Sequence, residues 1–341
     1  MRRAETALRP DTRSLGRRSV RTVPSPVVTS RRQLDPSRVD PRRFIDRRTV
    51  LRGGLGLGAA TFAGGLLAGC GDDTGTDTAV VGNGTPDNAL IAAFPQSVPH
   101  AAAGVATRLP YLLSDPEGVP LQEIDGPVRF TVAMDGAAVG TAIDVTPRSD
   151  GVPRAYLPFT FEFPQPGVYD VSAEYGGNKL DSTIQVYDVA QIGPPVVGEQ
   201  LPPVDSPTTL RPLDVDPLCS RVPACPFHDV NLQDAVGAGK PVVLLVATPA
   251  YCQTAVCGPV LDMLVEAVGS RTDIAVLHNE VYKNPKDVRD LNDAALAQVP
   301  QAYDLRFEPV LFVTNAAGTV VARADITVDR TEMAELLALA R

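Results

Sequence analysis

The order of basic, apolar and small residues between residues 47 and 70 indicates which part of this chain is removed by cleavage and which part remains to fold. Arg47 and Arg48 precede a short, glycine-rich apolar stretch that ends at Leu67-Ala68-Gly69-Cys70. A basic region, an apolar region and a small-residue cleavage site, in that order, are typical of a secretory signal, and the paired arginines indicate the twin-arginine type. The stretch from Gly53 to Gly69 is shorter than the roughly 20 apolar residues that a membrane span needs. We therefore expect residues 1–69 to be a signal peptide with a disordered lead.

This segment resembles a bacterial twin-arginine lipoprotein signal. The resemblance implies that Cys70 is lipidated as the first mature residue and that the chain is exported and anchored to the bacterial cell membrane. Residues 1–69 hold 15 of the 31 basic and 5 of the 40 acidic residues, so the mature chain has 16 basic and 35 acidic residues, a net charge of −19. Such an acidic protein is repelled by nucleic acid and by anionic lipid surfaces, which disfavours both as partners, and no nucleic-acid partner is expected.

Composition marks two linking segments in the mature chain. Residues 70–95 are polar and rich in Gly and Asp, which predicts a flexible tether. Residues 189–226 are dense in proline, with the pairs Pro194-Pro195 and Pro202-Pro203, which predicts an extended, semi-rigid spacer.

Residues 96–188, between the two linking segments, have the pattern of short strands. Apolar residues alternate with others from Leu157 to Phe163 and again from Tyr169 to Tyr175, and at least six such runs occur without a convincing helix. This pattern predicts an antiparallel β-sandwich. The Pro166-Gly167-Val168-Tyr169 run resembles the entry to a late strand of immunoglobulin-like domains. A sandwich without clustered reactive side chains is expected to act as a spacer or to bind a partner protein.

From Lys240 the pattern changes to buried strands alternating with helices. Pro241 to Ala247 is a continuous apolar run, typical of a central strand covered on both faces. A loop then delivers Cys252, and Cys257-Gly258-Pro259 opens a helix with one apolar face. A strand at 274–278, a hairpin over 310–322 and an amphipathic helix at 329–340 are predicted to follow.

Residues 227–341 resemble the thioredoxin superfamily in the order and spacing of these elements. The stretch from Tyr303 to Phe312 resembles the family's approach to its cis-proline, which assigns that role to Pro309. The predicted fold class is therefore an α/β thioredoxin-like C-terminal domain that follows an all-β, immunoglobulin-like sandwich. The domains are 96–188 for the sandwich, 189–226 for the spacer and 227–341 for the thioredoxin-like part.

The four cysteines other than Cys70 are expected to form disulfides, because the chain is exported and their number is even. Their spacing favours Cys219 with Cys225, as a structural disulfide, and Cys252 with Cys257, although crossed pairing stays open. Cys257 lies at a helix start, where the macrodipole favours a thiolate, so we assign it the lower pKa and the role of nucleophile. The reverse assignment is open, since Ala250-Tyr251-Cys252 resembles the family's approach to its nucleophile.

Two departures from the family bear on catalysis. Four residues, not two, separate Cys252 from Cys257, and Val246 stands where the family's reductases often keep a buried acid. A structural disulfide between Cys252 and Cys257 therefore competes with a redox role.

The chain contains three histidines, which are the candidate nitrogen ligands. His100 is expected to be solvated and His228 to belong to a loop or cap. His278 ends a predicted strand, and with Cys252 and Cys257 it would form a ligand set similar to that of Sco-type copper chaperones, because thiolates and imidazole suit copper. No zinc pattern with four suitably spaced ligands is recognised, and no cofactor is predicted.

The predicted function is thiol–disulfide exchange by a lipid-anchored, extracytoplasmic protein. In this reaction Cys257 attacks a disulfide of a substrate protein, Cys252 resolves the mixed disulfide, and Pro309 shapes the groove. The alternatives are a non-catalytic binding lipoprotein with structural disulfides and a Sco-like copper chaperone.

Overall fold

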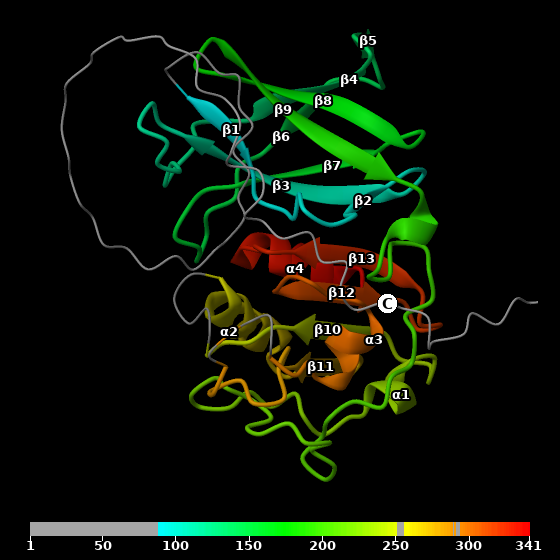
Figure 1. Cartoon of the computed structure of the whole chain (residues 1–341). Coiled ribbons are helices and arrows are strands. Elements are labelled where there is room, and N and C mark those ends of the chain that lie inside the picture. Colours follow the sequence, from blue (N-terminus) through cyan, green and yellow to red (C-terminus); the bar gives the residue numbers. More distant parts are fainter. Residues whose placement is uncertain (1–87, 251–255, 289, 291–293) are drawn as a thin grey trace, which may run out of the picture. The chain divides into compact units, whose positions relative to one another are not determined.

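The computed structural model describes residues 88–250, 256–288, 290 and 294–341 (Figure 1). Its first half contains strands but no α-helix. The bounds are β1 Ala89–Ala92, β2 Ala101–Ala102, β3 Ala106–Ser114, β4 Val128–Met134, β5 Ala137–Ala138, β6 Ile143–Val145, β7 Leu157–Glu162, β8 Gly167–Tyr175 and β9 Asn178–Tyr187. A short 3-10 helix, Val189–Gln191, follows β9.

These strands form two sheets that face each other across an aromatic core. One sheet has the order β1-β3-β7, and the other has the order β2-β9-β8-β4-β5 with β6 paired to β4. Phe130 of β4 stacks on Phe159 of β7 with ring centroids 4.8 Å apart, so the two sheets meet through aromatic side chains. The hairpin between β8 and β9 turns at Gly176 and Gly177, whose φ angles of 58° and 80° are those that a two-residue hairpin turn requires.

The second half is built on one mixed sheet of the order β11-β10-β12-β13. Strand β10 pairs parallel to β11 and antiparallel to β12, and β12 pairs antiparallel to β13. The bounds are α1 Leu232–Ala235, β10 Val242–Val246, α2 Cys257–Val268, β11 Ala275–Asn279, α3 Gln298–Ala302, β12 Val310–Thr314, β13 Val320–Asp325 and α4 Arg330–Ala338.

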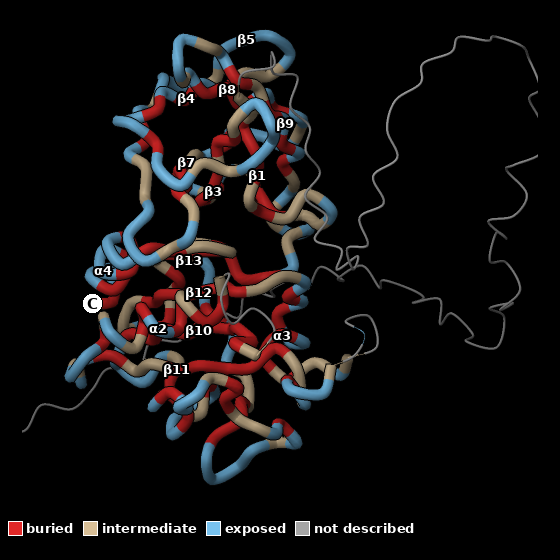
Figure 2. Tube along the Cα trace, turned by 90° about the vertical axis from the view of Figure 1, so that its left-hand side faces the viewer, coloured by how far each residue is buried: buried red, intermediate tan, exposed pale blue. Residues whose placement is uncertain are grey.

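Apolar side chains cover both faces of this sheet. Every residue of β10 and β12 is buried (Figure 2). Successive residues of β10 point to opposite faces: Val243 and Leu245 pack in the cluster that contains α2 and α4, whereas Val242 and Leu244 pack in the cluster that contains α1 and α3. A strand buried on both faces needs a continuous apolar run, which is why Pro241 to Ala247 lacks alternation.

The predicted fold class, an α/β thioredoxin-like domain after an immunoglobulin-like sandwich, is wrong because the chain is mostly β. Strands make up 33% and helices 13% of the described residues, in three sheets with four α-helices. The helical share is low because α1 spans four residues and α3 spans five. The described residues between 280 and 297 contain no helix either.

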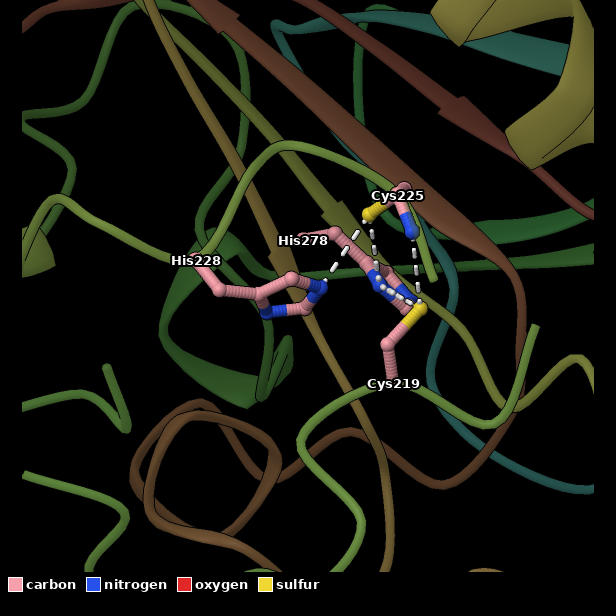
Figure 3. A group of neighbouring side chains, drawn as sticks. All are labelled: Cys219, Cys225, His228 and His278. Carbon is pink, nitrogen blue, oxygen red and sulfur yellow. Dashed lines mark hydrogen bonds between the residues drawn. The ribbon is translucent and has the colours of Figure 1, made fainter. Parts of the chain in front are cut away.

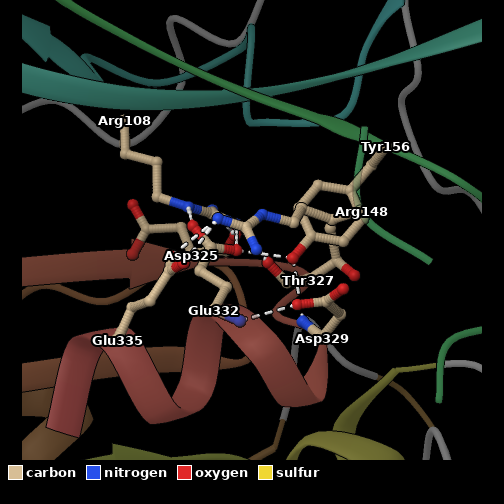
Figure 4. A network of polar contacts seen from close by, with 8 residues as sticks. All are labelled: Arg108, Arg148, Tyr156, Asp325, Thr327, Asp329, Glu332 and Glu335. Carbon is tan, nitrogen blue, oxygen red and sulfur yellow. Dashed lines mark hydrogen bonds and ion pairs between the residues drawn. The ribbon is translucent and has the colours of Figure 1, made fainter. Parts of the chain in front are cut away.

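A buried polar network joins the part of the chain that forms β1 to β9 to the part that forms β10 to β13 and α1 to α4, which are the first and second halves in this description (Figure 4). Arg108 of β3 binds Glu332 of α4 through two hydrogen bonds of 2.6 and 2.7 Å and donates to the carbonyl oxygens of Asp325 and Thr327. The Tyr156 hydroxyl donates to the same carboxylate at 2.5 Å. The described residues, from 88 onward, accordingly belong to a single unit.

The segment from Ile192 to Asn231 contains no strand or helix. It packs along β13 instead, where Val320 donates its backbone N–H to Glu199 and accepts that of Gly198. Loops of this length without regular structure are uncommon and are usually functional. Within the described part of the chain, no helix combines the length and the apolar character that a membrane crossing requires.

Candidate metal centre

Four buried side chains converge where this irregular segment meets the sheet (Figure 3). Cys219, Cys225 and His228 come from the segment, and His278 comes from β11. The sulfur and nitrogen atoms that they present all lie within 4.8 Å of one another. The group has the two-sulfur, two-nitrogen composition of common zinc sites.

Local structure brings the ligands together from two parts of the chain. The backbone N–H of His278 donates to the carbonyl oxygen of Phe227 at 3.1 Å, so the irregular segment runs beside the edge strand β11. Phe227 is buried in the same cluster as both cysteines, which fixes the position of His228 next to it. A spacing of three residues lets Cys225 and His228 face each other, with 3.1 Å between Sγ and Nε2.

The separations fit a tetrahedral ion. The Nδ1 atom of His278 lies 3.6 Å from Cys219 Sγ and 3.5 Å from Cys225 Sγ. For metal–sulfur and metal–nitrogen bonds of about 2.3 and 2.0 Å, the S···N edge of a regular tetrahedron is about 3.5 Å. The two measured edges therefore match the size of a zinc site.

The surroundings of His278 leave Nδ1 available as a ligand. Its Nε2 lies 3.0 Å from the carbonyl oxygen of Ala247. A carbonyl oxygen only accepts, so Nε2 carries the proton and Nδ1 presents its lone pair to the two sulfurs. A hydrogen bond from the second ring nitrogen to a carbonyl is the usual support of a metal-bound histidine.

The two thiols of the group have their pKa values shifted in opposite directions. Hydrogen bonding to Cys225 lowers the pKa of Cys219 well below its usual value, helped by His228 and His278. The same interaction raises the pKa of Cys225. Cys219 is thus the readily formed thiolate of the pair, and a thiolate is the form that binds metals.

One carboxyl lies behind the centre. Glu280 is 1% exposed, and its Oε1 accepts the N–H of Ser220, next to ligand Cys219, at 2.6 Å. Burial raises the pKa of Glu280 to about 8. Its Oε2 has no hydrogen-bond partner among the described residues.

The structure distributes the predicted site residues differently from the sequence analysis. The disulfide expected between Cys219 and Cys225 is not formed, since both are thiols. His278 faces this pair instead of completing a site with Cys257. Cys70 and Cys252 lie outside the described residues. His100, expected to be solvated, is buried 3.7 Å from Asp325.

Cys257 begins α2, as predicted, and is 1% exposed. Its Sγ lies 3.8 Å from Oε2 of Glu308, and the Glu308–Pro309 peptide bond is cis, as the resemblance implied for Pro309. The carboxylate near the thiol thus comes from the residue before the proline, whereas the sequence analysis looked for it at Val246.

Sequence analysis missed His228 and with it the metal centre. The signal was a run of two cysteines and a histidine, Cys219 to Cys225 to His228, with five and two residues between them. Because the two cysteines were predicted to form a disulfide, His228 was not considered as a ligand beside them. The fourth ligand, His278, follows 50 residues later, and only the path of the irregular segment along β11 brings it near.

Comparison with known proteins gives no relative that would assign the site. No protein-family model matches the chain, and no curated protein matches it significantly. The resemblance of residues 227–341 to the thioredoxin superfamily therefore stays a prediction.

Proposed function

We propose that this chain is a metal-binding protein whose centre holds one Zn²⁺ ion between Cys219, Cys225, His228 and His278. The observation that supports this best is the convergence of two sulfurs and two nitrogens, all within 4.8 Å of one another in a buried position, with two S···N separations of 3.5 and 3.6 Å. Four protein ligands leave no position for a substrate, which is typical of structural zinc sites. The ion would hold an irregular segment of the chain against the sheet.

The sequence supports a location for this protein outside the cytoplasm, anchored through lipidated Cys70. In an oxidising compartment two neighbouring thiols tend to form a disulfide. A bound cation prevents this, because both sulfurs are then used as thiolate ligands. The proposal therefore reconciles two thiols at contact distance with an exported chain.

The test is metal binding by the purified full chain under reducing conditions. We expect one equivalent of Zn²⁺, measured by elemental analysis, and a tetrahedral cobalt spectrum with thiolate charge-transfer bands when Co²⁺ replaces it. Loss of a supporting partner alone weakens metal sites by 10–100-fold. Replacing a ligand, as in Cys225→Ser or His228→Ala, should therefore lower the affinity by more than about 100-fold.

Matched controls separate the site from general effects of the substitutions. Cys257→Ser removes a buried cysteine that is not one of the four ligands, and His100→Gln removes a buried histidine that is not one of them. Both should bind one equivalent of Zn²⁺ as the parent chain does. A chain that binds neither Zn²⁺ nor Co²⁺, or whose cobalt spectrum lacks thiolate bands, would refute the proposal.

Thiol–disulfide exchange through Cys257 and Cys252 is the second candidate. It is favoured by the position of Cys257 at the first residue of α2, a 12-residue helix, with a carboxylate 3.8 Å from its sulfur. A reduction potential of the pair between roughly −120 and −270 mV would agree with exchange, and one below about −300 mV would indicate a structural disulfide. Retention of full exchange activity by Cys257→Ser would exclude Cys257 as the nucleophile.

A further inference from the structure

The metal centre and Cys257 share one buried cluster. Cys219, Cys225 and Cys257 all belong to the apolar core beneath α2 and α4. The short segment Ala247–Ala250 connects them, because it follows β10 and leads toward α2. Both ends of this segment are held by the metal ligands or their direct neighbours.

The first end is held by a ligand itself. Nε2 of His278 donates to the carbonyl oxygen of Ala247 at 3.0 Å, while its Nδ1 faces the sulfurs. The backbone N–H of Ala247 in turn donates to Asn279, the residue after the ligand. A metal ion on Nδ1 fixes the plane of the imidazole ring and thereby the direction of the Nε2–H bond.

The second end is held by the neighbour of another ligand. Ser220 follows Cys219 directly, and its hydroxyl accepts the backbone N–H of Ala250 at 2.8 Å. The backbone N–H of Ser220 donates to Glu280. Ser220 thus lies between ligand Cys219 and the segment, in a part of the chain that has no strand or helix to hold it.

The segment reaches Cys257 through a carboxylate. Oε2 of Glu308 accepts the backbone N–H of Thr248 and also lies 3.8 Å from Cys257 Sγ. The hydroxyl of Thr248 accepts the N–H of Val281, at the end of the β11 region. A displacement of the segment therefore changes the carboxylate that faces the thiol.

We infer that occupancy of the metal centre controls access to the Cys257 thiol. With the ion bound, Ser220 and His278 hold both ends of Ala247–Ala250, so that Thr248 keeps Glu308 beside the buried Cys257 thiol. Without the ion, the stretch from Cys219 to His228 loses its anchor, Ala250 loses its acceptor, and the segment opens. This inference rests on the proposed metal centre, and it adds a regulatory link from that centre to a second sulfur site.

The test compares alkylation of Cys257 in zinc-loaded and chelator-stripped full chain. Iodoacetamide is applied under native conditions with a phosphine reductant, and labelling of each cysteine is followed by peptide mass spectrometry. We expect Cys257 to be labelled at least about tenfold faster in the stripped protein, since native-state opening governs the reactivity of a buried group. Readdition of Zn²⁺ should restore slow labelling.

One variant distinguishes the effect of the Ser220–Ala250 hydrogen bond from the effect of metal binding. Ser220→Ala keeps all four ligands but removes the acceptor of Ala250, so it should bind one equivalent of Zn²⁺ and still show faster labelling of Cys257. Ser172→Ala, which removes a buried serine of the β-sandwich, is the matched control and should label as the parent does.

The outcomes distinguish this inference from the proposed function. If Zn²⁺ protects Cys219 and Cys225 but leaves the labelling rate of Cys257 unchanged, the centre exists and the link is wrong. If Zn²⁺ does not bind, the proposed function fails first. Labelling of zinc-loaded Ser220→Ala at the parental rate would also refute the role of Ser220.

Discussion

Glu332→Gln should destabilise the chain strongly, because it removes the carboxylate that Arg108 binds across the two halves. The two side chains are 7% and 9% exposed, and two hydrogen bonds of 2.6 and 2.7 Å join them. The glutamine retains an acceptor but leaves the guanidinium buried without its counter-charge. Breaking a buried pair by removing one partner raises the free energy of the folded state by about 3–5 kcal/mol. That is a large part of the 5–15 kcal/mol typical of a domain.

The assay is urea unfolding of the zinc-loaded full chain, followed by circular dichroism. The expected result is a lower midpoint with an unchanged slope, because the unfolded surface does not change. Asp144→Asn is the control, since the Arg129–Asp144 pair lies on the surface with both side chains 55% exposed, and such pairs add little stability. A loss below about 1 kcal/mol for Glu332→Gln would show that the Arg108–Glu332 pair adds no more stability than a surface pair, and would refute this reasoning.

Two further changes test other parts of the fold. Burial, opposed by Asp325, lowers the pKa of His100 from 6.5 to about 4. Between about pH 6.5 and pH 4, His100 is therefore protonated in the unfolded chain but not in the folded chain. The free energy of unfolding should fall by up to about 3 kcal/mol as the pH falls through this range. In urea titrations, His100→Gln should reduce this dependence of stability on pH. Gly318→Ala should destabilise more than Gly177→Ala in the same assay: both glycines have positive φ, but only at Gly318 would a Cβ lie 2.9 Å from a side-chain carbon of Val236. Equal losses of stability for the two alanine variants would show that the close contact with Val236 does not cause the destabilisation.

Strand positions were predictable because their side-chain pattern is local. The alternation from Leu157 to Phe163 and the apolar run from Pro241 to Ala247 correspond to β7 and β10, and Cys257 was correctly placed at a helix start. Alternating apolar residues indicate a strand with one buried face, a continuous apolar run indicates a strand with two buried faces, and apolar residues at helical spacing indicate a helix with one buried face. The overall class was not predictable in this way, because a local pattern does not fix how many residues each helix contains, and α1 and α3 span only four and five residues.

The metal centre was not predictable from local patterns. Three ligands belong to a proline-rich segment, for which composition favours an extended spacer, and its path along β13 and β11 depends on backbone contacts far apart in sequence. The predicted export of the chain favoured a disulfide between Cys219 and Cys225, and the group that these thiols form with His228 and His278 is visible only in the folded structure.

A bound ion would stabilise the irregular segment. Residues 192–231 form no strand or helix and are held to the sheet by scattered backbone hydrogen bonds, such as those of Gly198 and Glu199 with Val320. The contact from Cys219 to His278 closes a loop of 59 residues, and a permanent cross-link of that span would remove roughly 4 kcal/mol of unfolded-state entropy. Structural zinc contributes about 10–16 kcal/mol in small metal-dependent domains. If the chain is exported by the twin-arginine route that its sequence predicts, it folds in the reducing cytosol, where both thiols would be available to the ion. Binding before export would order the segment and protect the sulfurs at the same time.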